Sequence, residues 1–347
     1  MNSLSQHLVK ISPARRRLTR TVFFFITGIV LLFGSILVSI ATGAFDVSLS
    51  TILAAVFAFD GSKEHLIIQT IRIPRAFVTA FVGANLAVAG ALMQAITRNP
   101  LASPGVLGVN AGAAFVVVLL SVILPGMSGI VSLAAAFAGG AAAASVVYFI
   151  NAHVKGGSVE VKMALTGVAV QALLASLTQS LLIFNDQKTE MVLFWLAGSA
   201  AGMDWTDVKL LLPWSIAGLI AACCLGRSAS VIGLGEETAR GLGQRTAVAR
   251  GLCALMVVVL AGVSVSIAGP IGFVGLIVPH IARYLVGVDY RVVIPVSAIF
   301  GSVLLVLADI ASRFVSFPYE TPVGVVTALI GTPYFIYLAR RKRKVSK

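Results

Sequence analysis

The sequence predicts an all-α protein that crosses a membrane many times. Of its 347 residues, 58% are hydrophobic and only 11% are charged, whereas a soluble domain carries about 25% charged residues. Mean hydropathy is +0.99, and a soluble globule this apolar could not cover its surface with polar atoms. The composition therefore excludes a soluble domain, a disordered chain and a disulfide-framed secreted domain. The apolar runs are long and do not alternate with polar residues, which favours helices over a membrane barrel.

Ten transmembrane helices are expected, because the uncharged runs between fixed charges each supply about the 20 residues that a crossing helix needs. Two runs are too long for one crossing, and we divide them at the turns Leu124-Pro125-Gly126 and Gly269-Pro270. The first run is longer than the roughly 7–15 residues of a signal-peptide core, so it is kept as a helix of the mature chain. The spans are expected within 20–46, 75–98, 99–124, 126–152, 162–186, 209–227, 250–269, 270–283, 291–309 and 320–340.

The distribution of cations orients the chain. With both termini in the cytoplasm, 20 of the 26 Lys and Arg residues fall in inner segments and six in outer ones, as the positive-inside rule requires. This plan gives a cytoplasmic N-terminal segment (1–20), a transmembrane domain (21–340) and a basic tail (341–347) beside anionic membrane lipid. The net charge of +13 is thereby explained without nucleic-acid binding. The apolar stretch 191–203 is too short to span, and we expect a short or re-entrant helix at the outer face.

The sequence contains none of the motifs that we would expect of an enzyme or an ATPase. It has no GxxxxGK[ST] phosphate loop, no HExxH and no GxSxG, and its histidines and cysteines have no metal-ligand spacing. We therefore expect no catalytic residue, no cofactor and no metal site. Carboxylates are scarce at membrane depth; the nearest is Asp309, expected at a helix end. An ion-coupled carrier usually needs such groups, so energy is expected to come from a partner, with a self-contained secondary transporter as the rival interpretation.

The largest cytoplasmic loop (227–250) is the candidate contact for such a partner. Gly235 is expected to open a short helix whose first turn holds two glutamates, where acidic side chains suit the helix dipole. Two glycines should end that helix, and Thr246 should cap a second short helix. The two helices would form a compact knob, although an ordinary capped loop is the alternative. The residues assigned to it are Leu234, Gly235, Glu236, Glu237, Ala239, Arg240, Gly241, Leu242 and Gly243.

Five motifs in order resemble those of one transporter family. They are Arg72-Ile73-Pro74-Arg75; Gln94 with Asn99-Pro100-Leu101-Ala102; the loop Leu234–Gly243; Gly269-Pro270-Ile271-Gly272 through His280; and Asp309, Arg313 and the stretch from Pro322 to Pro333. Together they are similar to the iron-siderophore, haem and cobalamin permease family (FecCD-like) of type II ABC importers. The resemblance covers roughly residues 20–340.

This resemblance implies a permease subunit with the type II ABC importer fold in the bacterial cell (inner) membrane. It would pair with a second permease subunit, either an identical copy or a paralogue, and form the translocation pathway between the two. Two cytoplasmic ABC ATPase subunits would dock on the loop 227–250, and an extracytoplasmic binding protein would deliver the substrate. An iron(III)-siderophore complex is the expected substrate, with haem or cobalamin as alternatives.

The resemblance also assigns roles to single residues. Arg72, Arg75 and Arg313 are expected to meet carboxylates of the binding protein, a pairing that suits the guanidinium fork; anchoring to lipid headgroups is the alternative. On one predicted helix, Gln171, Thr178 and Gln179 are candidates to line the pathway, or else to hydrogen-bond neighbouring helices. Helix breaks at membrane boundaries are expected at Asn99 and Pro100, and at Gly269, Pro270 and Gly272.

Overall fold

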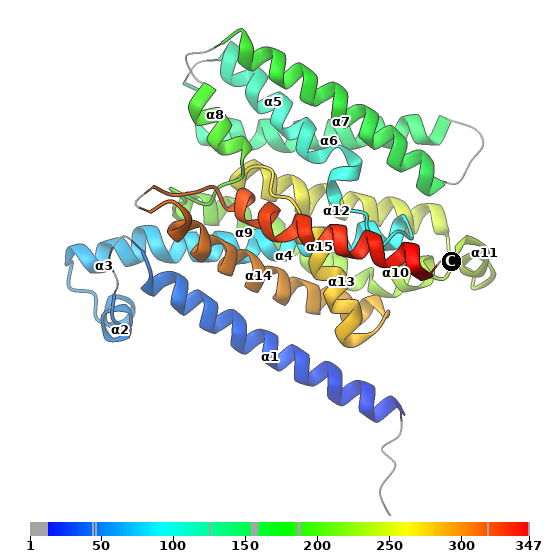
Figure 1. Ribbon diagram of the computed structural model, residues 1–347, viewed down its shortest axis with the longest axis horizontal. Coiled ribbons are helices and arrows are strands. Elements are labelled where there is room, and N and C mark those ends of the chain that lie inside the picture. The colour runs from blue at the N-terminus through cyan, green and yellow to red at the C-terminus, as the bar shows by residue number, and fades with distance from the viewer. Residues whose placement is uncertain are drawn as a thin grey trace, which may run out of the picture.

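The computed structural model describes residues 13–43, 45, 47–124, 126–153, 159–185, 189–317 and 319–345. These residues are almost entirely helical, and the only β-type pairing among them is an isolated bridge between Ser316 and Tyr319. Most of the long helices run along one common direction (Figure 1). The all-α prediction is confirmed.

The helices follow one another with short connections. In chain order they are α1 (Pro13–Ala41), α2 (Leu49–Phe57), α3 (Lys63–Ile67), η1 (Ile68–Arg72), α4 (Ile73–Ile96), η2 (Pro104–Leu107), α5 (Val109–Ile123), α6 (Gly129–His153), α7 (Val159–Ile183), α8 (Thr189–Leu196), α9 (Trp205–Cys224), α10 (Gly226–Gly233), α11 (Glu236–Gly241), α12 (Thr246–Ala268), α13 (Val274–Val286), α14 (Tyr290–Val315) and α15 (Val323–Val345).

Seven helical segments of the described chain are long and apolar enough to cross a membrane, which confirms a polytopic membrane protein. The other three expected spans coincide with shorter apolar helices, Val109–Ile123, Val274–Val286 and Val323–Leu338. A crossing count of ten therefore stays a prediction. The apolar stretch expected at the outer face (191–203) overlaps α8, which is eight residues long and begins at Thr189.

Helix α4 lies at the centre of the bundle, between α9, α12, α13 and α14. In the continuous helical segment that contains it, 83% of the most apolar window is buried, against 22% in α1. Glycines bring its backbone against its neighbours: a Cβ added to Gly83 would lie 2.3 Å from the carbonyl oxygen of Gly301, and one added to Gly90 would lie 1.9 Å from that of Gly275. Small residues of this kind let helix backbones approach closely in membrane proteins.

Two expectations about helix ends are wrong. The second span was expected within 75–98, but its helix begins earlier, at Lys63, and continues for 34 residues to Ile96. Pro74 is tolerated there because it follows the π-helical turn η1 and occupies the start of α4, where a missing N–H is least costly. Asp309 lies well inside α14 and not at its end; two arginines neutralise its charge, as described below.

The helix breaks lie where the sequence places them. Helix α4 ends at Ile96, and the Asn99 side chain accepts a hydrogen bond from the Leu101 N–H (3.0 Å) before η2 begins. Gly269 adopts φ +71° between α12 and α13. A Cβ at Gly269 would lie 2.1 Å from the carbonyl oxygen of Trp195, so glycine is required both by the backbone angle and by the contact with the end of α8.

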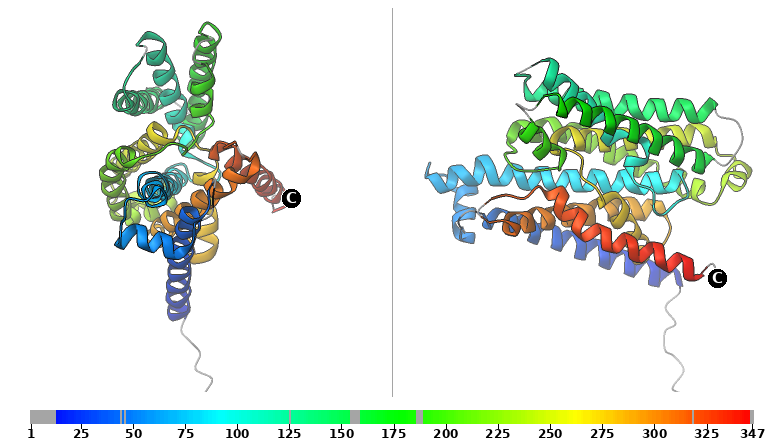
Figure 2. Two further views of the ribbon diagram at one scale, coloured as in Figure 1. Left: turned by 90° about the vertical axis from the view of Figure 1, so that its left-hand side faces the viewer. Right: turned by 45° about the horizontal axis from the view of Figure 1, so that its top comes forward.

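The molecule has two distinct ends. Helix α11, the first turns of α1 and the last turns of α15 lie at one end, and α2, α3 and α8 lie at the other (Figures 1 and 2). The knob loop and both described chain ends thus share one side, in agreement with the orientation that the cations predict.

Candidate functional site

The knob consists of two short helices, α10 and α11, joined at Leu234 and Gly235. Gly235 has φ +113° and starts α11, which ends at Gly241, and Gly243 has φ +76°. The expected helix start and end are therefore present. Thr246, however, is not a cap: it is the first residue of α12, which runs without a break to the membrane interior, so the second short helix of the knob precedes α11.

The knob presents two leucines to its surroundings. Leu234 and Leu242 flank α11, and each is 64% exposed, whereas Ala239 between them is fully buried. Exposed apolar side chains on a small rigid projection, next to charged groups, are typical of a protein-binding surface.

Ion pairs hold the knob on the bundle. Glu236 accepts a hydrogen bond from Arg240 (2.6 Å) within α11, and the guanidinium of Arg250 on α12 lies 3.2 Å from its carboxylate. The Gln244 N–H donates to the Ala239 carbonyl (3.0 Å), and the Gln244 side-chain amide donates to the carbonyl of Ser228 on α10 (3.2 Å). The sequence did not reveal Arg250 or Gln244 as part of the knob, because contacts between separate helices leave no periodic signal.

The knob is also tied to α14. The Ser230 hydroxyl on α10 accepts the Tyr290 N–H at 2.8 Å and lies 3.0 Å from the carboxylate of Asp289, the residue before α14. These contacts connect α11 through α10 to α14 and through Arg250 to α12.

A buried charge cluster lies at the opposite end of the bundle. The Asp309 carboxylate is 0% exposed and accepts hydrogen bonds from Arg75 (2.9 Å) and Arg313. Arg75 also pairs with Glu320 (2.8 Å), whose side chain is 42% exposed. The cluster joins α4, α14 and the segment before α15, and neither Asp309 nor Glu320 was assigned this role from sequence, because partners so far apart in the chain give no local signal.

Arg313 of this cluster and the nearby Arg72 attach α1. Arg72 donates to the carbonyls of Ile40 (2.7 Å), Ala41 (2.9 Å) and Phe45 (2.6 Å), which close the end of α1. Arg313 makes comparable bonds to Ser39 (2.7 Å) and Thr42 (2.8 Å).

The three arginines expected to dock a binding protein are only 6–8% exposed. They hold their own helices together and do not form a row of exposed guanidinium groups. Docking thus stays a prediction, and it requires an incoming carboxylate to compete with an internal partner.

The pathway candidates on α7 divide into two groups. Gln171 and Gln179 are exposed on the helix surface. Thr178 is buried and donates to the Leu174 carbonyl of its own helix (2.8 Å). Gln171 and Gln179 thus share an exposed face, as their spacing predicts, whereas the Thr178 hydroxyl is paired within the bundle; lining of the pathway by these three residues stays a prediction.

A multi-helix membrane body with broken helices, a buried charge cluster at one end and a projecting knob at the other is the architecture expected of a membrane permease. The chain belongs to the FecCD transport family, which matches residues 17–341. It is a multi-pass protein of the bacterial cell (inner) membrane and a transporter rather than an enzyme.

Relatives support this assignment over nearly the whole chain. The Fe(3+)-citrate import system permease protein YfmD of Bacillus subtilis is 51% identical, with 96% of this chain and 99% of the relative covered. The iron(3+)-hydroxamate import system permease protein FhuB of the same organism is 46% identical, with 93% and 84% covered. A solved inward-facing structure of a metal-chelate type ABC transporter superposes with a TM-score of 0.81 and 27% identity, covering 91% of this chain and 98% of that one.

Proposed function

We propose that the chain is the translocating subunit of an ATP-driven importer for chelated iron(III), bound to a siderophore or to citrate. Each copy would pair with a second permease subunit, identical or paralogous, and the substrate would pass between them. The names of the relatives support iron chelates as the cargo, and haem or cobalamin is the alternative within the same family.

The knob is the observation that carries the ATP-driven mechanism. It projects from the end of the bundle where cations predict the cytoplasm, its two leucines are exposed, and its contacts reach α12 and α14. An ABC ATPase subunit that binds these two leucines would displace α12 and α14 when it closes. Two permease copies would then alternate between outward-open and inward-open states.

The exposed surface of α7 supports a pathway between two copies. Gln171 and Gln179 offer uncharged donors and acceptors there. A surface with amide groups and, over residues 163–183, no charged side chain would let a bulky chelate pass without holding it tightly. Substrate selection would then rest with the extracytoplasmic binding protein.

Docking of that binding protein is proposed to proceed by carboxylate exchange at Arg75. Glu320 is the half-exposed partner of Arg75, whereas Asp309 on the other side of the guanidinium is fully buried. A carboxylate of the docked protein would displace Glu320 and leave the buried pair in place. The exchange frees the segment before α15 and so would report docking to the permease.

Reconstitution tests the proposed function. Proteoliposomes that contain the permease, its ATPase and a binding protein loaded with radioactive iron(III) citrate should accumulate iron only with ATP at the ATPase face. The permease alone under a proton or sodium gradient should take up none. Uptake by the permease alone would establish the self-contained secondary transporter instead. Competition by haem or cobalamin but not by iron chelates would refute the assignment of iron chelates as the cargo.

A further inference from the structure

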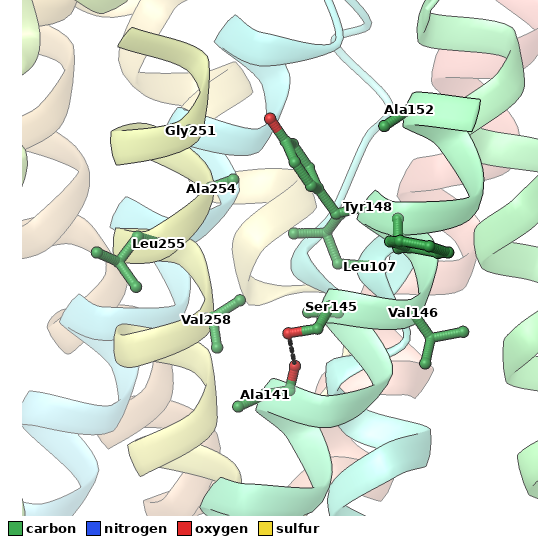
Figure 3. A pocket seen from close by; sticks show the side chains of 12 residues that line it. Leu107, Ala141, Ser145, Val146, Tyr148, Ala152, Gly251, Ala254, Leu255 and Val258 are labelled. Carbon is green, nitrogen blue, oxygen red and sulfur yellow. Dashed lines mark hydrogen bonds between the residues drawn. The ribbon is translucent and has the colours of Figure 1, made fainter. Parts of the chain in front are cut away.

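An open apolar cavity lies between α6 and α12, on a part of the bundle for which the proposed transport cycle gives no role. Its volume is about 780 Å³, and of its twelve lining residues only Ser145 and Tyr148 carry polar side-chain atoms. The Ser145 hydroxyl is already bonded to the Ala141 carbonyl (2.8 Å), as Figure 3 shows. In the same view the Tyr148 ring projects from α6 toward Gly251 and Ala254 on α12. The cavity therefore offers almost no hydrogen-bonding partner to a polar ligand.

A second, more polar cavity continues the first one at its cytoplasmic end. It has a volume of about 270 Å³ and shares Tyr148, Ala152 and Ala254 with the apolar cavity. Lys162 and Arg250 line it together with Asn151. The side-chain oxygen of Asn151 is buried and accepts no hydrogen bond from any described residue. The two cavities together form one long apolar cleft. Two cations and a hydrogen-bond acceptor, the Asn151 side-chain oxygen, lie at one end of it.

The dimensions of the cleft correspond to one leaflet of a membrane. From Arg250 to Val258, the lining of α12 extends eight residues, or about 12 Å along the helix axis. Half of a hydrocarbon core is roughly 15 Å. Lys162 and Arg250 lie near the predicted cytoplasmic ends of α7 and α12, at the depth of the inner headgroups, where anionic lipids attract Lys and Arg.

We infer that this cleft binds an anionic phospholipid of the inner leaflet, with an acyl chain between α6 and α12 and the phosphate between Lys162 and Arg250. A phosphatidylglycerol headgroup would also donate a hydroxyl to Asn151. Arg250 contacts Glu236 of the knob at 3.2 Å, so the bound phosphate and the knob share one guanidinium. The inference needs neither the cargo nor the ATPase, and it goes beyond the proposed function.

Photolabelling of the intact permease in membranes tests the site. The probes are phosphatidylglycerol and phosphatidylcholine with the same diazirine-bearing acyl chain, and labelled peptides are mapped by mass spectrometry. The phosphatidylglycerol probe should label the cleft residues of α6 and α12, and it should exceed the phosphatidylcholine probe there. Removing one cation by Lys162→Gln or Arg250→Gln should reduce this preference by about fivefold, the factor expected for one cation near anionic lipid.

A blocking substitution with a matched control makes the test specific. A Cβ at Gly251 meets no atom within 4 Å, and the same is true of Gly34 on α1. Gly251→Phe should abolish cleft labelling, whereas Gly34→Phe should leave it unchanged. Ser145→Phe, which closes the cleft from α6, provides a second block should Gly251→Phe fail to fold.

Several results would overturn the inference. Labelling that survives both blocks, or that is equal for the two lipids, excludes an anionic lipid site. Competition by free glycerol phosphate would identify a soluble phosphate as the ligand. Crosslinks from α6 of one copy to α6 of another, with no lipid label, would assign the cleft to a protein interface.

Discussion

Asparagine in place of Asp309 is the substitution for which the structure predicts the largest loss of stability. The native carboxylate has no solvent exposure and neutralises two guanidinium groups, those of Arg75 and Arg313. Asp309→Asn leaves both cations buried with one neutral amide between them. Breaking a buried ion pair by changing one partner costs about 3–5 kcal/mol, which is roughly a 150- to 5,000-fold change in the ratio of folded to unfolded protein.

Glu320→Gln is the matched control for this substitution. It removes a carboxylate from the same arginine, Arg75, but the Glu320 side chain is 42% exposed and water screens its charge. Exposed pairs contribute about 1 kcal/mol or less. Both variants are to be unfolded with SDS in the same mixed micelles, with tryptophan fluorescence and circular dichroism as readouts of the free energy of unfolding.

A double variant separates the ion pair from other effects of the substitution. Arg75→Gln combined with Asp309→Asn should lose about 1–3 kcal/mol less than the two single losses added together, because each single change already breaks the same contact. Equal losses for Asp309→Asn and Glu320→Gln, or strict additivity in the double variant, would refute the assignment of a buried, mutually neutralising cluster.

Three further predictions concern the central helix, the knob and the end of α1. Gly90→Ala forces a methyl group onto a backbone carbonyl of α13 and should lower the free energy of unfolding by about 1–3 kcal/mol. Gly34→Ala, where the added methyl group meets open space, should not lower it. Equal Tm values for the two variants would contradict the close contact between α4 and α13. Leu234→Asp with Leu242→Asp should abolish co-purification of the ATPase while leaving the Tm within about 2 °C, since both side chains are exposed; retained ATPase would remove the knob from the docking surface. Arg72→Leu leaves three carbonyls without their donor and should lower the free energy of unfolding by about 2–4 kcal/mol. The loss should be seen as earlier proteolytic cleavage after α1. An unchanged cleavage pattern would argue against the anchoring role of Arg72.

The sequence was sufficient for the fold class, the helix breaks and the boundaries of the knob helix α11. Each of these depends on local chemistry: the length of an apolar run, proline at Pro100, or glycine with positive φ at Gly235 and Gly269. The family motifs then placed these features in one transporter class.

The contacts made by the charged residues could not be predicted in the same way. A sequence shows that Arg75 and Arg313 are near the outer end of the bundle, but their burial depends on Asp309 and Glu320, which are distant in the chain. The ion pair between Arg250 and the knob residue Glu236 could not be predicted for the same reason. The burial of Thr178 could not be predicted either, because helical spacing alone does not say which side of α7 the rest of the bundle covers.

The glycine contacts of α4 restrict how the permease can change shape. Where Gly83 and Gly90 touch the backbones of α14 and α13, sliding by even one residue would drive a side chain into a space that holds none. We therefore expect α4, α13 and α14 to move as one rigid unit. A displacement of α14 by the knob would then carry α4 and α13 with it, and the remaining helices would rotate against this unit.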